Sequence, residues 1–537
     1  MNDKLSRTAL IQDVRQFNNI FETAHPDPYI NGGGKIAYHR RLQELIRDIP
    51  IDGITKESFF YRIQSFAAKI VDAHTGFIKD ETSRDKEKPG GVPLYFAPVE
   101  DILYVDAVCQ KKHLNLIGLK LVSVEGISYE ELINRMKNLS GFDNLSNLLY
   151  KLGRFGMLYF RDGLKELIPE WNDENQIKVT LLSPDGLEKE FLFSTKKGVV
   201  YPLFRLESNI TIPNSDMRLA YHFIDKDGKI AYLKIGDMIT FREAHELFLE
   251  IGLKDFLEYA KEEYEKIHEK SAPEEMKDLV PGLPSATELF TFLIKDMKEA
   301  ETEYLMVDLR HCRGGQDYII QFLLYFLVGF ERAVELTQRR SSILKLSEFF
   351  KTTTPGQQTN LKDIPYYDQV PLTIKDYVFS DDRSFVYQGR DEDFLLHTCE
   401  WFTEDFKKMP SFNKEFRTRA FEAHYMPKKI IVLCSDVTHS SGYDLMRNLN
   451  RIGAVNIGVP SGQSGNHYGN TRMFELSNSK IKGKVATRFF IDAPDKPMKQ
   501  LTLYPDYPLT YEKLASLNFD ENAAVLYALD LIKEKKV

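Results

Sequence analysis

The sequence predicts a mixed α/β protein whose largest part is a mostly parallel sheet covered by helices. The first 80 or so residues have helical periodicity, and short strands separated by turns follow them. After residue 201, strand-like apolar runs alternate with helical segments, which is typical of a parallel sheet. We therefore expect a helical region at 1–90, a β module at 92–200, an α/β domain at 201–334 and 426–537, and an insertion of unknown shape at 335–425.

The composition narrows the possible functions. The 537 residues carry a net charge of −8 without a Lys/Arg-rich stripe, so nucleic acid is not an expected partner. The cysteines form no CxxC pair, which argues against a zinc ribbon and against a disulfide scaffold. No pattern implies a metal ion or an organic cofactor.

We expect a cytoplasmic protein without a membrane span. Residues 1–21 contain no apolar segment of the signal-peptide type. The longest apolar stretch, Tyr318–Phe330, is shorter than the roughly 20 residues that a span needs, so it predicts a buried helix.

The helical region ends in a segment with candidate catalytic residues. Thr55 is a predicted N-cap, and Phe59 and Ile63 follow it at helical spacing. The helix leads into Asp72-Ala73-His74-Thr75, and residues 83–91 form a predicted linker.

The β module is predicted from alternating apolar residues. Strands are expected at Leu103–Val108, Leu119–Val124 and Ile177–Leu182, and a turn at 183–186 allows residues 188–193 to return as a hairpin. The segment Leu119–Gly126 resembles the strand and turn of PDZ domains.

The α/β domain has the clearest strand signals. Strands are expected at Ile230–Ile235, Tyr304–Leu309, Lys429–Cys434, Val455–Val459 and Lys484–Ile491. Helices are expected at 241–264 and 285–297, from Gly315 to Gly329, and from Ser441 to Asn450.

Ser440 is the candidate nucleophile. It follows the buried strand Lys429–Cys434 at the start of a helix, where free N–H groups and the helix dipole stabilise an oxyanion. The N–H of Ser441 and an N–H of the pair Gly314-Gly315 would be the donors. The alternatives are an ordinary helix N-cap for Ser440 and a simple tight turn for the glycines.

His74 and His467 are the candidate bases. A serine hydroxyl needs a neighbouring base to become nucleophilic, and Asp72 lies close enough in sequence to help orient His74. His467 lies in a Gly-rich loop after a strand and is the competitor. A surface or capping role is the alternative for either histidine.

Five motifs, in the same order, resemble those of the C-terminal-processing (tail-specific) and tricorn proteases. They are Asp72–Thr75, Val307–Gly315, Thr438–Gly442, the loop from Ile457 onward, and Leu503–Asp506. The resemblance covers residues 1 to about 509 without the insertion. It implies a crotonase-like catalytic domain with a PDZ-like module, peptide or protein substrates and an acyl-enzyme. The implied roles are Ser440 as nucleophile, His74 as base, and the N–H groups of Gly314, Gly315 and Ser441 as oxyanion donors.

The chain departs from the family's pattern in two places. Residues 463–469 contain no lysine where bacterial tail-specific members have their base, so a tricorn-like Ser/His pair fits better. Near the position of the tricorn glutamate the chain has Lys499, with Asp492 and Asp495 upstream, and Asp495 is the predicted third catalytic residue.

Two other functions stay open. One is a catalytically inactive member that binds peptides or an apolar ligand. The other is a crotonase-fold enzyme that transfers acyl groups between small molecules, against which the PDZ-like segment argues.

Overall fold

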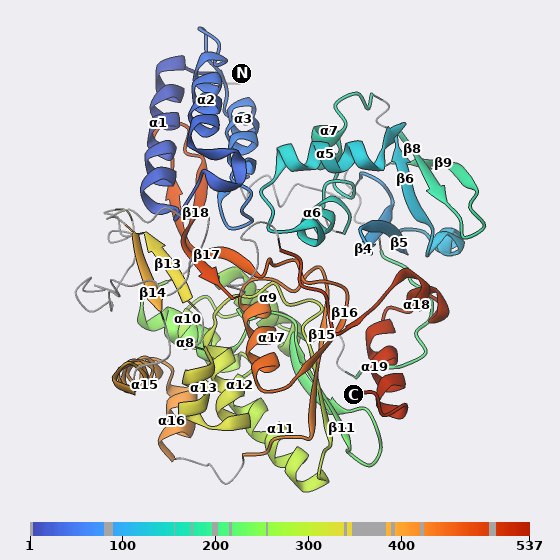
Figure 1. The fold of residues 1–537 in the computed structure, drawn as a ribbon, viewed down its shortest axis with the longest axis vertical. Helices are drawn as coiled ribbons and strands as arrows, with labels where there is room; N and C mark the ends of the chain where they lie inside the picture. Colours follow the sequence, from blue (N-terminus) through green and yellow to red (C-terminus); the bar gives the residue numbers. More distant parts are fainter. Residues whose placement is uncertain are drawn as a thin grey trace.

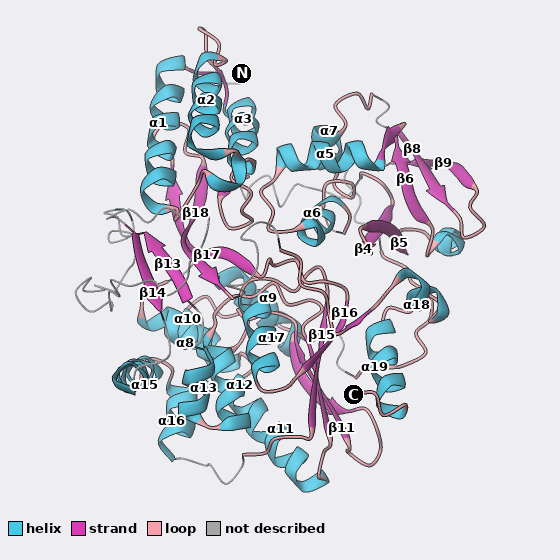
Figure 2. Cartoon of the chain, in the orientation of Figure 1, coloured by secondary structure: helices cyan, strands magenta, loops and turns pink. Residues whose placement is uncertain are grey.

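The computed structural model contains helices and strands throughout the residues it describes (Figures 1 and 2), which confirms the predicted mixed α/β class. It describes residues 4–537 except 80–89, 155, 173–174, 196–201, 214–216, 254–255, 338–340, 346–348, 350–382, 388–391, 419–423 and 493–500. No helix within the described residues has both the length and the apolar character needed to cross a membrane.

The N-terminal part is helical, as predicted. It consists of α1 (Arg7–Ala24), α2 (Gly34–Arg47) and α3 (Lys56–Ala68), with the short strands β1 (Lys4–Leu5) and β2 (Ile54–Thr55). The Thr55 hydroxyl accepts a hydrogen bond from the N–H of Ser58 and caps α3, as expected. The apolar faces of these helices share one core with Phe474 and Val485, which come from the C-terminal part of the chain. In Figure 1 the helices accordingly stand over β17 and β18.

The next unit contains one antiparallel sheet. Its strands are β4 (Leu94–Val99), β5 (Ile102–Val108), β6 (Lys120–Val124), β7 (Ile127–Ser128), β8 (Gln176–Leu182) and β9 (Glu188–Ser194). The predicted β8–β9 hairpin is present, and Gly186 N–H donates to Ser183 O at 2.9 Å in its turn. The unit is less dominated by strands than predicted, because α5 (Tyr129–Leu139), α6 (Leu145–Leu152) and α7 (Arg161–Leu167) bury its sheet. These helices are short, and the sequence analysis did not recognise their caps at Ser128 and Asn144.

The mostly parallel sheet of the chain has the predicted α/β character. Its order is β10 (Leu219–Phe223), β11 (Ile230–Ile235), β12 (Tyr304–Asp308), β15 (Lys429–Cys434), β16 (Val455–Gly458) and β19 (Tyr507–Pro508). All neighbouring pairs from β11 to β19 are parallel, and β10 is antiparallel to β11. β19 begins just after Leu503–Asp506, the segment where the sequence predicted the closing strand.

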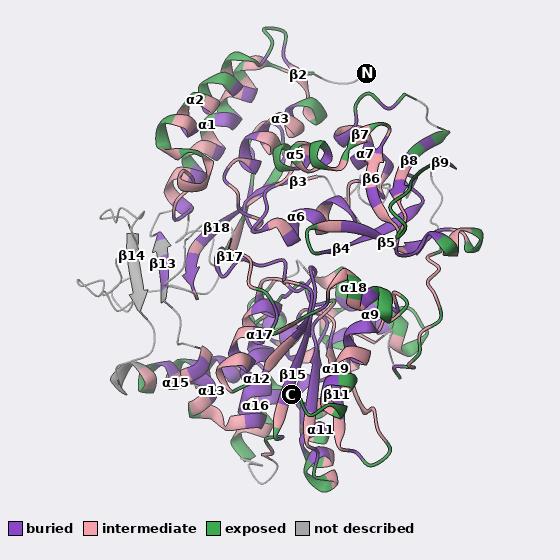
Figure 3. Ribbon diagram, turned by 45° about the vertical axis from the view of Figure 1, so that its right-hand side comes forward, coloured by how far each residue is buried: buried purple, intermediate pink, exposed green. Residues whose placement is uncertain are grey.

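Helices cover both faces of this sheet, and its central strands β11, β12 and β15 are mostly buried (Figure 3). One face packs on α8 (Arg242–Glu250), α11 (Ala286–Ala300), α12 (Tyr318–Val328) and α17 (Ser441–Arg451), and the other on α19 (Ala523–Lys533). Residues Tyr318 to Leu327 of α12 are all buried, which confirms the prediction of a buried helix. The single helix predicted at 241–264 is two, α8 and α9 (Leu257–His268), because Gly252, with φ 71°, follows the end of α8.

The described residues of the insertion belong to this domain. β13 (Ser341–Lys345) pairs with β14 (Arg383–Tyr387) and with β18 (Lys482–Ile491), which also pairs with β17 (Asn466–Glu475) and β3 (Gly76–Ile78). α15 (Glu392–Phe406) and α16 (Pro410–Thr418) contribute aromatic rings to the core, and the rings of Phe322 and Phe412 lie 3.9 Å apart. Residues 335–425 are therefore partly a structural component of the core.

Candidate active site

The carboxyl ends of three adjacent parallel strands meet at one edge of the mostly parallel sheet. β12 leads to Gly314-Gly315, β15 leads to Ser440, and β16 leads to residues 461–464. Open α/β sheets gather their ligands and reactive groups at this edge. The loops are tied together, since the Thr438 hydroxyl donates to Leu309 O at 2.8 Å. The strand order thus brings together segments that are distant in sequence.

Ser440 occupies a strained turn between β15 and α17. Its backbone has φ 54° and ψ −131°, a combination that non-glycine residues rarely adopt. Such strain costs about 1–3 kcal/mol and is concentrated at functional sites. The side chain makes no capping hydrogen bond to α17, all of whose residues are described, so it does not act as an ordinary N-cap. A strained serine between strand and helix is the geometry of a nucleophile elbow.

Gly314 lies directly against this turn. It has φ 88°, and a Cβ atom added to it would lie 2.7 Å from Ser441 N and 2.9 Å from Ser440 Cβ. The hydroxyl of Ser441 donates to Gly315 O at 3.0 Å, which holds the two loops together. In the described part of the chain, no acceptor pairs with the backbone N–H of Ser441. An unpaired N–H beside Ser440, facing a glycine loop, is the arrangement that an oxyanion hole requires.

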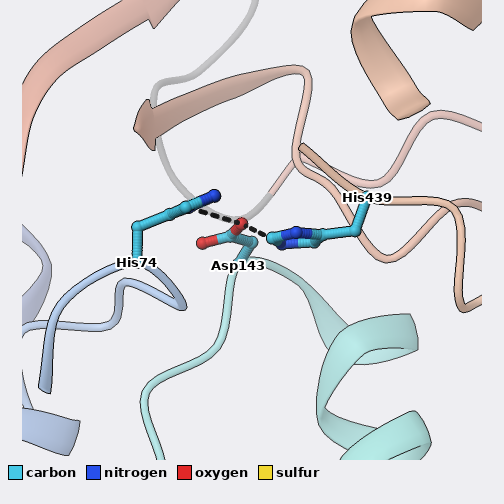
Figure 4. A group of neighbouring side chains, drawn as sticks. All are labelled: His74, Asp143 and His439. Carbon is cyan, nitrogen blue, oxygen red and sulfur yellow. Dashed lines mark hydrogen bonds and ion pairs between the residues drawn. The ribbon is translucent and has the colours of Figure 1, made fainter. Parts of the chain in front are cut away.

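A carboxylate lies between two imidazoles, one of which belongs to His439, the residue that precedes Ser440 (Figure 4). Asp143 Oδ2 is 2.9 Å from His439 Nε2 and 3.8 Å from His74 Nδ1. The two imidazole rings are stacked, with centroids 4.8 Å apart and an interplanar angle of 22°. The N-terminal helical part contributes His74, the antiparallel unit Asp143 and the α/β domain His439, so the group forms where these parts meet. His74, the predicted base, thus contacts the residue that precedes Ser440.

Burial and mutual contact set the charges of this group. Burial lowers the pKa of His439 to about 4, although its hydrogen bond to Asp143 acts in the opposite direction. Burial would raise the pKa of Asp143, but the hydrogen bond from His439 and the nearby imidazoles outweigh it and lower that pKa. At neutral pH the arrangement is therefore a carboxylate beside a neutral His439.

A second carboxylate holds His74 from the other side. Asp72 Oδ1 accepts the N–H of His74 at 2.8 Å and lies 3.7 Å from His74 Nδ1. Asp72 Oδ2 lies 3.2 Å from Nε2 of the buried His25. Burial would raise the pKa of Asp72, but contacts with His25 and His74 hold it well below its usual range. Nδ1 of His74 thus faces two ionised carboxylates, which leaves Nε2 on the opposite side of the ring.

Gln463 connects Ser440 to the carboxylate of Asp143. Its Oε1 accepts the N–H of Ser440 at 2.9 Å, and its Nε2 donates to Asp143 Oδ2. Asn144 Nδ2 donates to Ser461 O at 2.9 Å and to Gln463 O at 3.1 Å, which docks the start of α6 onto this loop. The antiparallel unit therefore packs against the loops of the site and also contributes Asp143 to it.

His467, the competing base, lies in a different cluster. Its Nε2 is 4.0 Å from Asp444 Oδ1 and its Nδ1 is 3.9 Å from Asp492 Oδ2. Its ring packs against those of Tyr443 and Phe490. Asp444 belongs to the first turn of α17, so His467 lies along that helix, whereas His74 lies at the His439 side chain.

Several members of the site were not predicted from the sequence. They are Asp143, His439 and Gln463. Asp143 directly precedes Asn144, the N-cap of α6, and that cap is the one sequence signal that could have drawn attention to it. Asp495, the predicted third residue, and Lys499 lie outside the described residues.

The chain is similar in fold to solved structures of mature CPAF, a peptidase of the tail-specific type. The complex of mature CPAF with lactacystin aligns over 98% of this chain and 99% of that one, with a TM-score of 0.57 and 13% identity. Another structure of mature CPAF covers 96% of both chains, with a TM-score of 0.56 and 14% identity. The photosystem II D1 C-terminal processing protease also matches over 94% of both chains, with a TM-score of 0.40 and 12% identity. No protein-family model matches the chain, and no curated protein sequence does.

These similarities show a shared fold. The likeness to mature CPAF extends over nearly the whole chain, including the helical part and the antiparallel unit. The resemblance to tail-specific peptidases predicted from the motifs is confirmed in this sense.

Proposed function

We propose that the chain is a serine peptidase in which Ser440 is the nucleophile and His74 the base. The strained backbone of Ser440 is the observation that carries this proposal, because a folded protein retains such strain mainly where function uses it. The free N–H of Ser441 and the adjacent glycine loop supply the electrostatic stabilisation that acyl transfer needs. The shared fold of mature CPAF adds to the case.

The proposed reaction proceeds through an acyl-enzyme. Ser440 Oγ attacks the peptide carbonyl, while His74 takes the hydroxyl proton and passes it to the leaving amine. The Ser441 N–H and an N–H of Gly314 or Gly315 hold the oxyanion, each contributing about 10²–10³ in rate. Water then attacks the ester, with the imidazole again acting as base. Asp72 and Asp143 stabilise the imidazolium formed at His74, and a role for Asp495 stays a prediction.

The same proposal gives a role to each part of the chain. The α/β domain of 201–334 and 426–537 would be a crotonase-like catalytic domain, and residues 92–200 a PDZ-like module that binds an extended peptide at a sheet edge. The hydrogen bonds of Asn144 with the 461–464 loop support a module that senses or shapes the site. Residues 1–90 supply the base.

A fluorophosphonate probe tests the proposal directly. We expect stoichiometric labelling of the wild-type protein at Ser440, loss of labelling in Ser440→Ala, and retained labelling in Ser441→Ala. Circular dichroism of each variant controls for folding. Absence of labelling in a folded wild-type protein would favour the alternative, an inactive member that binds peptides or an apolar ligand.

A further inference from the structure

The group of His74, Asp143 and His439 has the donor set of a transition-metal site (Figure 4). One carboxylate oxygen and one nitrogen of each imidazole lie within 4.8 Å of one another. Donors at about 2.0–2.2 Å from a tetrahedral zinc ion are roughly 3.3–3.5 Å apart. Asp143 Oδ2 is already 2.9 Å from His439 Nε2 and 3.8 Å from His74 Nδ1, so small side-chain movements would complete the geometry.

A buried nitrogen without a partner points into this group. The side chain of His74 is 10% exposed, and among the described residues its Nδ1 has no hydrogen-bond partner. A buried polar atom that stays unpaired costs about 1–3 kcal/mol, so its retention calls for a reason. The nitrogen faces the carboxylate oxygens of Asp72 and Asp143, which is the electrostatic environment that attracts a cation.

A backbone hydrogen bond orients the carboxylate of Asp143 within this group. The Ala73 N–H donates to Asp143 Oδ1 at 2.9 Å, while Oδ2 lies toward the two imidazoles and also accepts a hydrogen bond from Gln463 Nε2.

We propose that His74, Asp143 and His439 bind a divalent transition-metal ion, with zinc as the best match, and that the bound ion inhibits the protein reversibly. The proposed inhibition rests on the proposed function, because the ion would bind His74, the proposed base. The ammonium group of nearby Lys151 would repel a bound cation. We therefore expect binding that a chelator reverses.

Calorimetric titration of ZnCl₂ into Ser440→Ala protein tests the binding half without any need for activity. The expected result is one saturable zinc site, with affinity reduced at least tenfold by adding His439→Gln or Asp143→Asn. His39→Gln, at a partly exposed histidine outside the group, is the control and should not alter binding. No saturable site, or a site unaffected by both ligand variants, would overturn the proposal.

A second measurement avoids variants that fail to fold. CoCl₂ added to the wild-type protein should produce the visible absorption of imidazole-ligated cobalt, and ZnCl₂ should abolish it. Zinc should also lower probe labelling of wild-type Ser440, with recovery after EDTA. Zinc binding without any labelling at Ser440 would refute the peptidase proposal and the inhibition while supporting the metal site. Full labelling in saturating zinc would overturn the inhibitory role.

Discussion

The rings of His74 and His439 are stacked with their centroids 4.8 Å apart, and one oxygen of Asp143 lies within 3.8 Å of a nitrogen of each ring. Two charged rings at this spacing would repel each other strongly in a buried site. His439 avoids the conflict, because burial lowers its pKa to about 4 and keeps it neutral at physiological pH. A neutral His439 leaves His74 able to accept the proton of Ser440 without a positively charged imidazole beside it. The stack therefore supports a division of roles, with His74 as base and His439 as its positioning partner.

Replacement of the base tests this division. His74→Ala should lower kcat for peptide hydrolysis by about 10²–10⁴-fold, because the serine loses its proton acceptor. His467→Ala should lower it less than tenfold, since His467 lies beside Asp444 and Asp492 instead of the His439 side chain. Single-turnover kinetics with an activated ester and a peptide would compare the two variants. The opposite ranking would assign the base to His467.

Gly314 should be essential for the oxyanion site although it carries no side chain. In Gly314→Ala the new methyl group would meet Ser441 N at 2.7 Å and displace a proposed donor, so kcat should fall by about 10²–10³-fold. Gly186→Ala is the matched control, because Gly186 has a similar φ of 80° but nothing within 4 Å of the added carbon. Both variants carry backbone strain, and only the first touches Ser440. Equal activity in the two would remove Gly314 from the proposed site.

The ion pair between Arg154 and Asp436 should hold the antiparallel unit on the catalytic loop. Arg154 Nε and Nη2 donate to the carboxylate at 2.6 and 2.9 Å, and the Asp436 side chain is fully buried. Arg154→Met should cost about 3–5 kcal/mol of stability, because it leaves a buried carboxylate unpaired. Adding Asp436→Asn should restore part of this loss. Urea unfolding of the wild type, both single variants and the double variant measures the effect, and additive losses would speak against direct coupling.

The mostly parallel sheet was predictable because its central strands are continuous apolar runs. The predicted boundaries of Lys429–Cys434 and Ile230–Ile235 coincide with β15 and β11, which need no long-range information to be recognised. Ser440 stood out for the same reason, since it follows such a strand and opens a helix. The strain in its backbone left no trace in sequence, because its φ is fixed by packing against Gly314.

The charged centre of the site was much less predictable. Asp143 reaches His439 only because the loop before α6 docks on residues 461–464, and that docking depends on contacts between units. No local pattern encodes such a contact. The helix α6 itself spans only Leu145–Leu152, too short for a clear helical period beside the predicted strands.

Acid should destabilise the protein through His245, a buried residue of α8 that lies outside the proposed site. Burial lowers the pKa of His245 to about 4, so the folded state keeps this ring neutral while the unfolded chain protonates it near its usual value of about 6.5. The unfolded state then binds more protons between these two values, and stability must fall as the pH is lowered from about 6.5 toward 4. A shift of this size lowers the free energy of unfolding by about 3 kcal/mol at the acid end, and by about 2 kcal/mol between pH 7.5 and pH 5.

Comparison of wild-type protein with His245→Leu isolates this contribution. The variant removes the titrating group from the apolar face of α8, where the ring packs against Phe248. Urea unfolding at pH 7.5 and pH 5 should show that the wild type loses about 2 kcal/mol more than the variant. His39→Leu, at a partly exposed histidine, should behave like the wild type. An identical acid response of wild type and His245→Leu would mean that His245 is hydrated or paired in the folded protein, and that its burial does not govern acid stability.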